Sequence, residues 1–119
     1  MKLTRKAFMD RGAGVSARRA MRFRDMVEKK GGSKSAKMFP TVMVLLGGLT
    51  LNRLADNLGL TKEDNEVDVT EEMFDRAMAD VVAEDAKDEH TSIVTSLETT
   101  IFCVEMSEAL FGKENDDET

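Results

Sequence analysis

The longest apolar run of this chain spans residues 42–51, with the sequence VMVLLGGLTL. A helix built on this run needs cover on most of its sides, which packing inside a domain supplies. Pro40 suits the first turn of such a helix, where its missing N–H costs nothing. The run therefore predicts a helix over about residues 40–58. It is shorter than the roughly 20 apolar residues that cross a bilayer, so we expect no membrane span.

Glycines mark two features of this predicted helix. Gly47 and Gly48 each cost roughly 1 kcal/mol relative to alanine, so we expect another backbone to cross closely there. Gly59 followed by Leu60 is typical of a left-handed C-terminal cap with its hydrophobic contact. We therefore expect the helix to end at Gly59.

Two further amphipathic segments follow. Thr70 is a suitable N-cap for a helix over residues 70–88, whose apolar positions recur at helical spacing. A last helix is expected over 91–111, with its apolar arc centred on Val94, Leu97, Ile101 and Val104 and widened by Phe102, Met106, Ala109 and Leu110. The arcs over 40–58 and 91–111 are wide for a small bundle, and we expect a homodimer or a protein partner to cover the surplus.

The N-terminal part has a different pattern. Residues 1–11 predict a short helix that is interrupted at Gly12-Ala13-Gly14, and Ser16 is a suitable N-cap for a second helix over Ala17–Lys30. Residues 31–35, with the sequence GGSKS, indicate a flexible connection.

At 119 residues the chain has room for one domain. We predict an all-α fold, a small single-domain helical bundle of four to five helices. Within it we distinguish a basic N-terminal helical segment (1–37), a helical core (38–112) and an acidic tail (113–119).

Charge is strongly segregated along the chain. Residues 1–40 carry 12 Lys or Arg against 3 Asp or Glu, whereas residues 41–119 carry 5 against 20. The net charge of −6 thus conceals +9 followed by −15. Such a distribution offers two faces to partners, and it lets the two parts attract each other within one chain or between copies.

The basic part supplies the first candidate site. Its charge density suits contacts with nucleic-acid phosphates or with an acidic protein, and Phe23 is a candidate stacking group. The candidate residues are Arg18, Arg19, Arg22, Arg24, Lys29 and Lys30. The competing interpretation is that they pair with the acidic part of the same protein.

The acidic side of the helix over 70–88 supplies the second candidate site, formed by Asp75, Asp80 and Glu84. These carboxylates form either an ordinary solvated face or a partner face. In the second case they would imitate the phosphates of a nucleic acid and occupy a basic groove on another protein.

Residues Leu54–Thr61 resemble the first helix and turn of the helix-turn-helix family of DNA-binding motifs, with Ala55 four positions before the turn residue Gly59. That resemblance implies a second helix that presents polar or basic groups to the major groove. Residues 62–68 are mostly acidic instead, and phosphate would repel them. We interpret the segment as an ordinary capped helix end. The acidic residues that follow lack the glycine and the glutamate of a calcium-binding loop, which indicates a solvated connector.

Few residues offer chemistry. A single cysteine, Cys103, excludes an intrachain disulfide and a cysteine-built zinc site, and it lies in an apolar segment typical of a buried thiol. The single histidine, His90, fits a capping or surface position better than a catalytic one. We expect no cofactor, no metal and no enzymatic activity.

These patterns predict a cytoplasmic, non-enzymatic protein that acts through protein–protein contacts or regulation. Small helical proteins of this composition are common among phage and mobile-element accessory factors, which is an analogy of type. The alternatives are a nucleic-acid-binding protein that uses its basic N-terminal helix and an acidic inhibitor that mimics nucleic acid.

Overall fold

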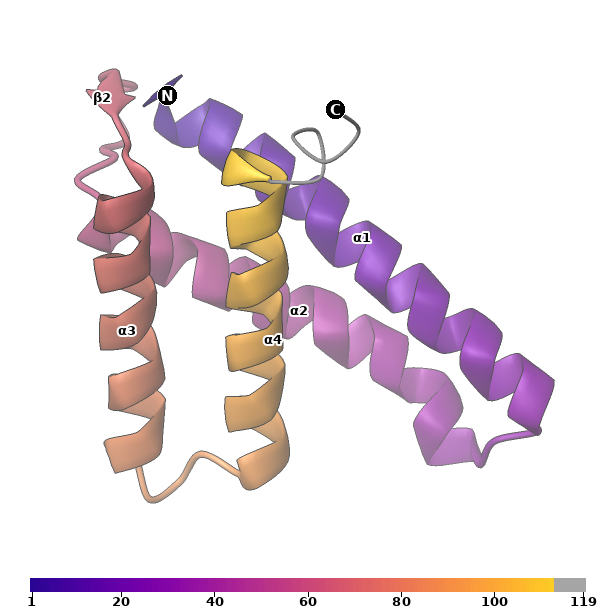
Figure 1. Cartoon of the computed structure of the whole chain (residues 1–119). Helices are drawn as coiled ribbons and strands as arrows, with labels where there is room; N and C mark the ends of the chain where they lie inside the picture. Colours follow the sequence, from indigo (N-terminus) through magenta and orange to yellow (C-terminus); the bar gives the residue numbers. More distant parts are fainter. Residues whose placement is uncertain (113–119) are drawn as a thin grey trace.

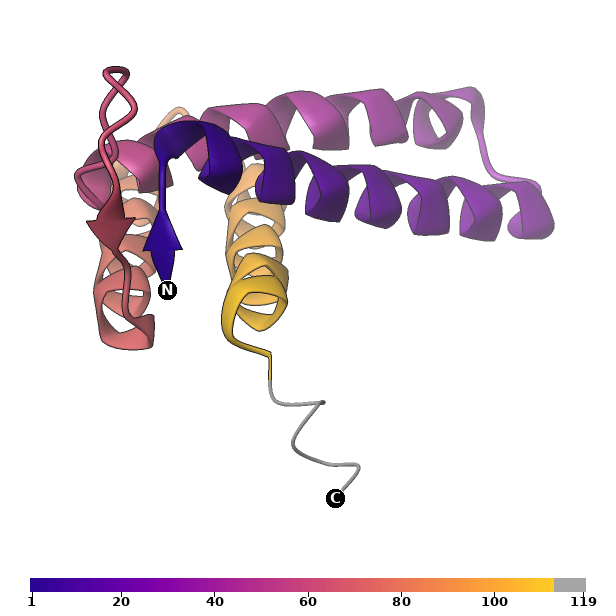
Figure 2. The same ribbon diagram turned by 90° about the horizontal axis from the view of Figure 1, so that it is seen from above.

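The computed structural model describes residues 1–112, and within this range the chain forms four helices and two short strands. In chain order these are β1 (Lys2–Leu3), α1 (Arg5–Lys30), α2 (Lys34–Asn57), β2 (Val67–Asp68), α3 (Glu71–Lys87) and α4 (Ile93–Phe111). Helices α1 and α2 form one antiparallel hairpin, and α3 and α4 form another that crosses it in a second layer (Figure 1, Figure 2). The predicted all-α bundle is confirmed.

A hydroxyl residue directly precedes each of the four described helices and caps its N-terminus. The side chain of each N-cap accepts a hydrogen bond from the backbone N–H three residues later, which satisfies one of the free amides at the helix start. These N-caps are Thr4, Ser33, Thr70 and Ser92. Thr70 was predicted from the sequence, and α3 follows it directly.

Helix α1 is continuous, so the predicted break at Gly12-Ala13-Gly14 is wrong. Gly12 is buried against Leu51 of α2, and a Cβ atom at Gly12 would lie only 2.2 Å from Leu51 Cδ2. This glycine therefore permits a close helix contact rather than a turn. Ser16 lies inside α1 and is buried, so it is not an N-cap.

Helix α2 begins earlier than predicted, at Lys34, because Ser33 caps it. Pro40 consequently lies in the second turn rather than the first, and the connection to α1 shortens to residues 31–33. Among the described residues, α2 is the one helix long and apolar enough to cross a membrane by length and composition, with 33% of its most apolar window buried. Core helices of soluble proteins meet the same criteria, so this finding carries little weight.

The two glycines of α2 have different surroundings. A Cβ atom at Gly47 would lie 2.7 Å from Ser16 Oγ of α1, whereas one at Gly48 would meet nothing within 4 Å. Of these two glycines, the expected close crossing therefore occurs at Gly47 and not at Gly48.

Helix α2 ends as the sequence predicts. Gly59 has a φ of 78°, the N–H of Leu60 donates to the carbonyl of Ala55 at 3.0 Å, and Leu60 is buried. This is a Schellman cap with its hydrophobic contact. No second helix follows within the described residues 60–70, so the chain departs from the helix-turn-helix pattern. It continues through an exposed connector into β2, which pairs antiparallel with β1.

The core lies where the two layers meet. Its largest fully buried side chains include Phe8, Phe74 and Phe102, with the ring centroids of Phe8 and Phe74 6.5 Å apart. Helix α4 directs Phe102, Met106 and Leu110 inward. The face that the sequence placed at the centre of its apolar arc points outward instead, with Val94, Leu97, Ile101 and Val104 all exposed.

Candidate interaction surfaces

The predicted basic site is divided by the fold. Arg19 is only 6% exposed and makes a bidentate ion pair with Glu98 of α4, with Nη2 to Oε1 at 3.0 Å. Its Nε also lies 3.4 Å from Glu105. Burial opposes the charge of the guanidinium, but the hydrogen bonds and charges of these two glutamates outweigh it and raise the pKa of Arg19. Arg19 therefore joins the two layers and is not a surface ligand.

Arg22 has a related position nearer the surface, where its Nη2 lies 2.8 Å from Glu105 Oε1. The sequence leaves open whether the basic and acidic parts of one chain pair with each other. In the structure they do so at Arg19 and at Arg22. Arg18, Arg24 and the two lysines at positions 29 and 30 remain exposed.

The far end of the α1–α2 hairpin extends beyond α4 (Figure 1). We name its exposed basic residues the basic tip: Arg24, Lys29, Lys30, Lys34 and Lys37. Only two acidic residues, Asp25 and Glu28, lie in the same stretch of sequence. The structure therefore keeps a cationic surface at this end.

The predicted acidic face lies on α3, and all three of its residues are exposed. Glu84 is held by α2, because Arg53 Nη2 lies 2.9 Å from its Oε1. Asp75 and Asp80 are exposed to solvent on α3. Glu84 is also exposed, but it forms an ion pair that links α3 to α2.

Exposed apolar residues gather on two helices. The α2 stripe comprises Met38, Val42, Leu45 and Leu49, and the α4 stripe comprises Val94, Leu97, Ile101 and Val104. Their spacing of three and four residues places each set on one face of its helix. Leu45 and Leu49 are 65% and 63% exposed. Clustered exposure of this kind marks an interaction surface more often than scattered apolar residues do.

An apolar groove of about 370 Å³ lies beside the α2 stripe, between α1 and α2. Its walls carry Met9, Ala13, Ala17, Val44, Gly48 and Leu51. Ala13 and Ala17 have small side chains and Gly48 has none, so the groove has room for a leucine-sized group. Ser16 also lines it, with a buried hydroxyl that has no hydrogen-bond partner among the described residues.

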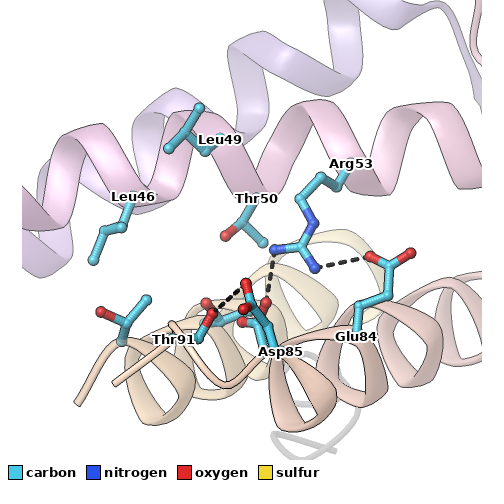
Figure 3. A pocket seen from close by; sticks show the side chains of 10 residues that line it. Leu46, Leu49, Thr50, Arg53, Glu84, Asp85 and Thr91 are labelled. Carbon is cyan, nitrogen blue, oxygen red and sulfur yellow. Dashed lines mark hydrogen bonds and ion pairs between the residues drawn. The ribbon is translucent and has the colours of Figure 1, made fainter. Parts of the chain in front are cut away.

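A second cavity, of about 320 Å³, is polar (Figure 3). Arg53 of α2 reaches across it and binds both Glu84 and Asp85 of α3, with Nη1 to Asp85 Oδ1 at 3.0 Å. Burial disfavours the charge of Arg53, but these two carboxylates outweigh that effect and raise its pKa. Threonine side chains complete the walls, from Thr50, Thr91, Thr95 and Thr99. We name this cavity the Asp85 pocket.

The two residues with potential for chemistry lie apart from this pocket's lining. His90 is exposed, and its backbone N–H donates to Asp88 Oδ1 at 2.9 Å. Cys103 is buried, and burial raises the pKa of its thiol to about 12. At neutral pH the thiol is therefore protonated and unreactive.

No protein-family model matches this chain, and no curated protein or solved structure shows significant similarity to it.

Sequence reasoning missed the Asp85 pocket and misplaced Arg19. The pocket combines residues 46–53, 84–91 and 95–99, and no spacing in the sequence relates these segments. Arg19 occurs within a run of arginines in which nothing distinguishes the buried member. The groove has one signal in the sequence, the cluster of small residues around Gly12 and Gly47. The same glycines also predict a helix break at Gly12-Ala13-Gly14, which the continuous α1 contradicts.

Proposed function

We propose that this protein is a non-enzymatic interaction protein that assembles through its exposed apolar helix faces, and that a second copy of the chain covers the α2 stripe. The α2 stripe is the observation that carries the proposal. It presents four large side chains to solvent on one face of a helix whose opposite face is already packed. Burial of such a stripe against another helix removes apolar surface from water and so stabilises the assembled state.

The α2 surface is suited to pairing with itself. Leu45 and Leu49 project from the helix, and the groove beside Val44 and Gly48 offers space of matching size. A two-fold axis through the middle of α2 would insert the leucines of each copy toward the groove of the other. This is an isologous contact, in which one patch serves both partners.

Charge favours an antiparallel pair. The N-terminal end of α2 carries Lys34 and Lys37, whereas an acidic connector holding Glu63, Asp64 and Glu66 follows its other end. Antiparallel packing brings these unlike charges together, and it also opposes the helix dipoles. A parallel pair would bring lysine against lysine. The middle of the helix, residues 38–51, carries no charge that would oppose either arrangement.

The free energy gained by burying the α2 stripe is comparable with the free-energy cost of association. Burying an apolar side chain of this kind stabilises by about 1.5–3 kcal/mol, and a symmetric contact buries the α2 stripe of both copies. Association costs about 4–15 kcal/mol in lost freedom of motion. Burial of eight such side chains, already partly covered, therefore contributes a free energy of the same order as this cost.

Light scattering coupled to size exclusion tests the proposal. We expect the wild-type protein to elute as a dimer at about 50 µM, and the double variant Leu45→Glu/Leu49→Glu to elute as a monomer with unchanged circular dichroism. Ala79→Glu/Ala83→Glu adds the same two charges at exposed positions of α3 and should leave the dimer intact. A wild-type monomer at several hundred micromolar would overturn the proposal.

A second candidate function, nucleic-acid binding, rests on the basic tip. Phosphate contacts by several Lys and Arg produce affinity that falls steeply with salt. Fluorescence anisotropy with single- and double-stranded oligonucleotides at low salt tests this function. Binding that weakens in Lys29→Glu/Lys30→Glu supports it, and absence of binding at low ionic strength eliminates it.

The third function, mimicry of nucleic acid, rests on the two solvent-facing carboxylates Asp75 and Asp80. It predicts that a basic nucleic-acid enzyme co-purifies with the protein from its native cell and that Asp75→Asn/Asp80→Asn abolishes the association. Retention of the enzyme by this double variant would exclude the interpretation.

A further inference from the structure

The Asp85 pocket contains a carboxylate oxygen that the fold leaves unused. Asp85 is only 8% exposed, and its Oδ1 accepts from Arg53 at 3.0 Å. Its other oxygen, Oδ2, is buried and has no hydrogen-bond partner among the described residues. A buried charged acceptor without a donor is unfavourable, so this position favours a bound group that donates hydrogen bonds.

The charges around the pocket select a cation. Three carboxylates line it, from Glu84, Asp85 and Asp88, against the single guanidinium of Arg53. Arg53 is directed at Glu84 and Asp85, and Asp88 accepts from His90 and Thr91. The lining therefore keeps a net charge of −2, with Asp85 Oδ2 as its one buried unpartnered oxygen within the described chain.

The remaining lining indicates the shape of the cation. Hydroxyl groups of Thr50, Thr95 and Thr99 can accept hydrogen bonds from an ammonium group. Leu46 extends from α2 toward the pocket and supplies an apolar wall (Figure 3). No group of three His, Cys, Asp or Glu residues in residues 1–112 is arranged to hold a metal ion. A cation that combines an ammonium head with a short alkyl chain matches this lining.

We propose that the Asp85 pocket binds a primary alkylammonium group, whose N–H donors bind Asp85 Oδ2 and the threonine hydroxyls while its carbon chain contacts Leu46. The group belongs either to a free amine or to a lysine side chain. The carboxylates of this site, from Glu84, Asp85 and Asp88, lie on α3 and directly after it, outside the α2 stripe. Among the described residues, Leu49 is the one residue that the pocket lining and the α2 stripe share.

Titration of the isotopically labelled full chain with n-butylammonium chloride, followed by amide NMR, tests the proposal. We expect saturable shifts at residues 84–99 with a millimolar Kd, and no such shifts with n-butanol at the same concentration. Asp85→Asn should weaken binding at least tenfold, whereas Asp80→Asn, which changes an exposed carboxylate of the same helix, should not.

A second variant avoids disturbing Arg53. Thr95→Leu fills the pocket from α4 and should also abolish the shifts while the circular dichroism spectrum stays unchanged. Parallel titrations with 1,4-diaminobutane and with N-acetyl-lysine methylamide distinguish the two sources of the ammonium group. Tighter binding of the diamine indicates a free amine, and tighter binding of the lysine derivative indicates a lysine side chain. Equal shifts with butylammonium and butanol, or wild-type affinity in folded Asp85→Asn or Thr95→Leu, would overturn the proposal.

The same titrations distinguish this proposal from the proposed assembly. Loss of amine binding leaves the dimer measured by light scattering unaffected. A monomeric wild-type protein that still binds butylammonium contradicts only the assembly.

Discussion

Arg19 of α1 and Glu98 of α4 form a buried bidentate ion pair that spans the boundary between the two helical hairpins. Each side chain is less than a tenth exposed. The guanidinium also lies over the ring of Phe102, 5.9 Å from its centroid. This pair fixes how α4 is placed on α1, because both charges have left water and neither has a comparable partner elsewhere in the described chain.

Removal of one member of this pair should destabilise the protein strongly. We expect Glu98→Ala to lower the free energy of unfolding by about 3–5 kcal/mol, because it leaves a buried guanidinium with only Glu105 nearby. Arg22→Ala, which breaks a more exposed pair with Glu105, should cost about 0–1 kcal/mol. Urea denaturation followed by circular dichroism measures both. Equal losses in the two variants would show that Arg19 is solvated.

The adjacent glycines of α2 should respond oppositely to alanine. Gly47→Ala brings a Cβ atom within 2.7 Å of Ser16 Oγ, so we expect a loss of about 1–3 kcal/mol from overpacking. Gly48→Ala meets nothing within 4 Å and should stabilise the helix by about 1 kcal/mol. Thermal unfolding of both variants provides the comparison. A gain in Gly47→Ala would mean that α1 and α2 do not cross there.

A similar pair of variants tests the continuity of α1. Gly14→Ala places its Cβ atom in ordinary contact with the side chain of Arg18, 3.5 Å away, and should stabilise a continuous helix by up to about 1 kcal/mol. Gly12→Ala would collide with Leu51 and should destabilise the protein. Chemical denaturation measures both changes. If the chain turned at these glycines, Gly14→Ala would be the harmful substitution.

Cys103 should contribute a pH-dependent stability. Burial raises the pKa of its thiol from 9.0 to about 12, so the folded state holds the proton more tightly than the unfolded state does. This contribution is complete below the unfolded pKa and is lost as the pH rises from about 9 toward about 12. The stability of the wild type relative to Cys103→Ala should therefore fall between about pH 9 and about pH 12. A difference that is constant with pH would show an accessible thiol.

The helix positions that were predicted correctly depend on local chemistry. Thr70 and Gly59 act through hydrogen bonds to residues within one turn, so their roles are visible in the sequence. The errors concern contacts between distant segments. A glycine at position 12 suits a turn and a close helix contact equally well, so the local sequence does not distinguish the two. The position of Leu51 on α2 shows that the contact is the one that forms.

The exposed surfaces were predictable in part. The surplus of apolar area on α2 and α4 follows from composition and spacing, but the choice of the inward face of α4 depends on α1 and α3. Phe102 and Met106 are bulkier than Val94 and Val104 and fill the space between the layers. Among the predicted basic residues, Arg19 is buried because Glu98 lies opposite it, a relationship between positions 79 residues apart.

Each hairpin joins helices that are neighbours in the sequence, through only three residues between α1 and α2 and five between α3 and α4. Short loops of this kind close quickly and lose little entropy. We therefore expect the two hairpins to form early in folding, and the slow event to be their docking, when Arg19 and Glu98 are dehydrated together. A chain whose hairpins have formed but not yet docked would expose its core phenylalanines to other chains. We therefore expect aggregation to compete with folding mainly at this docking step.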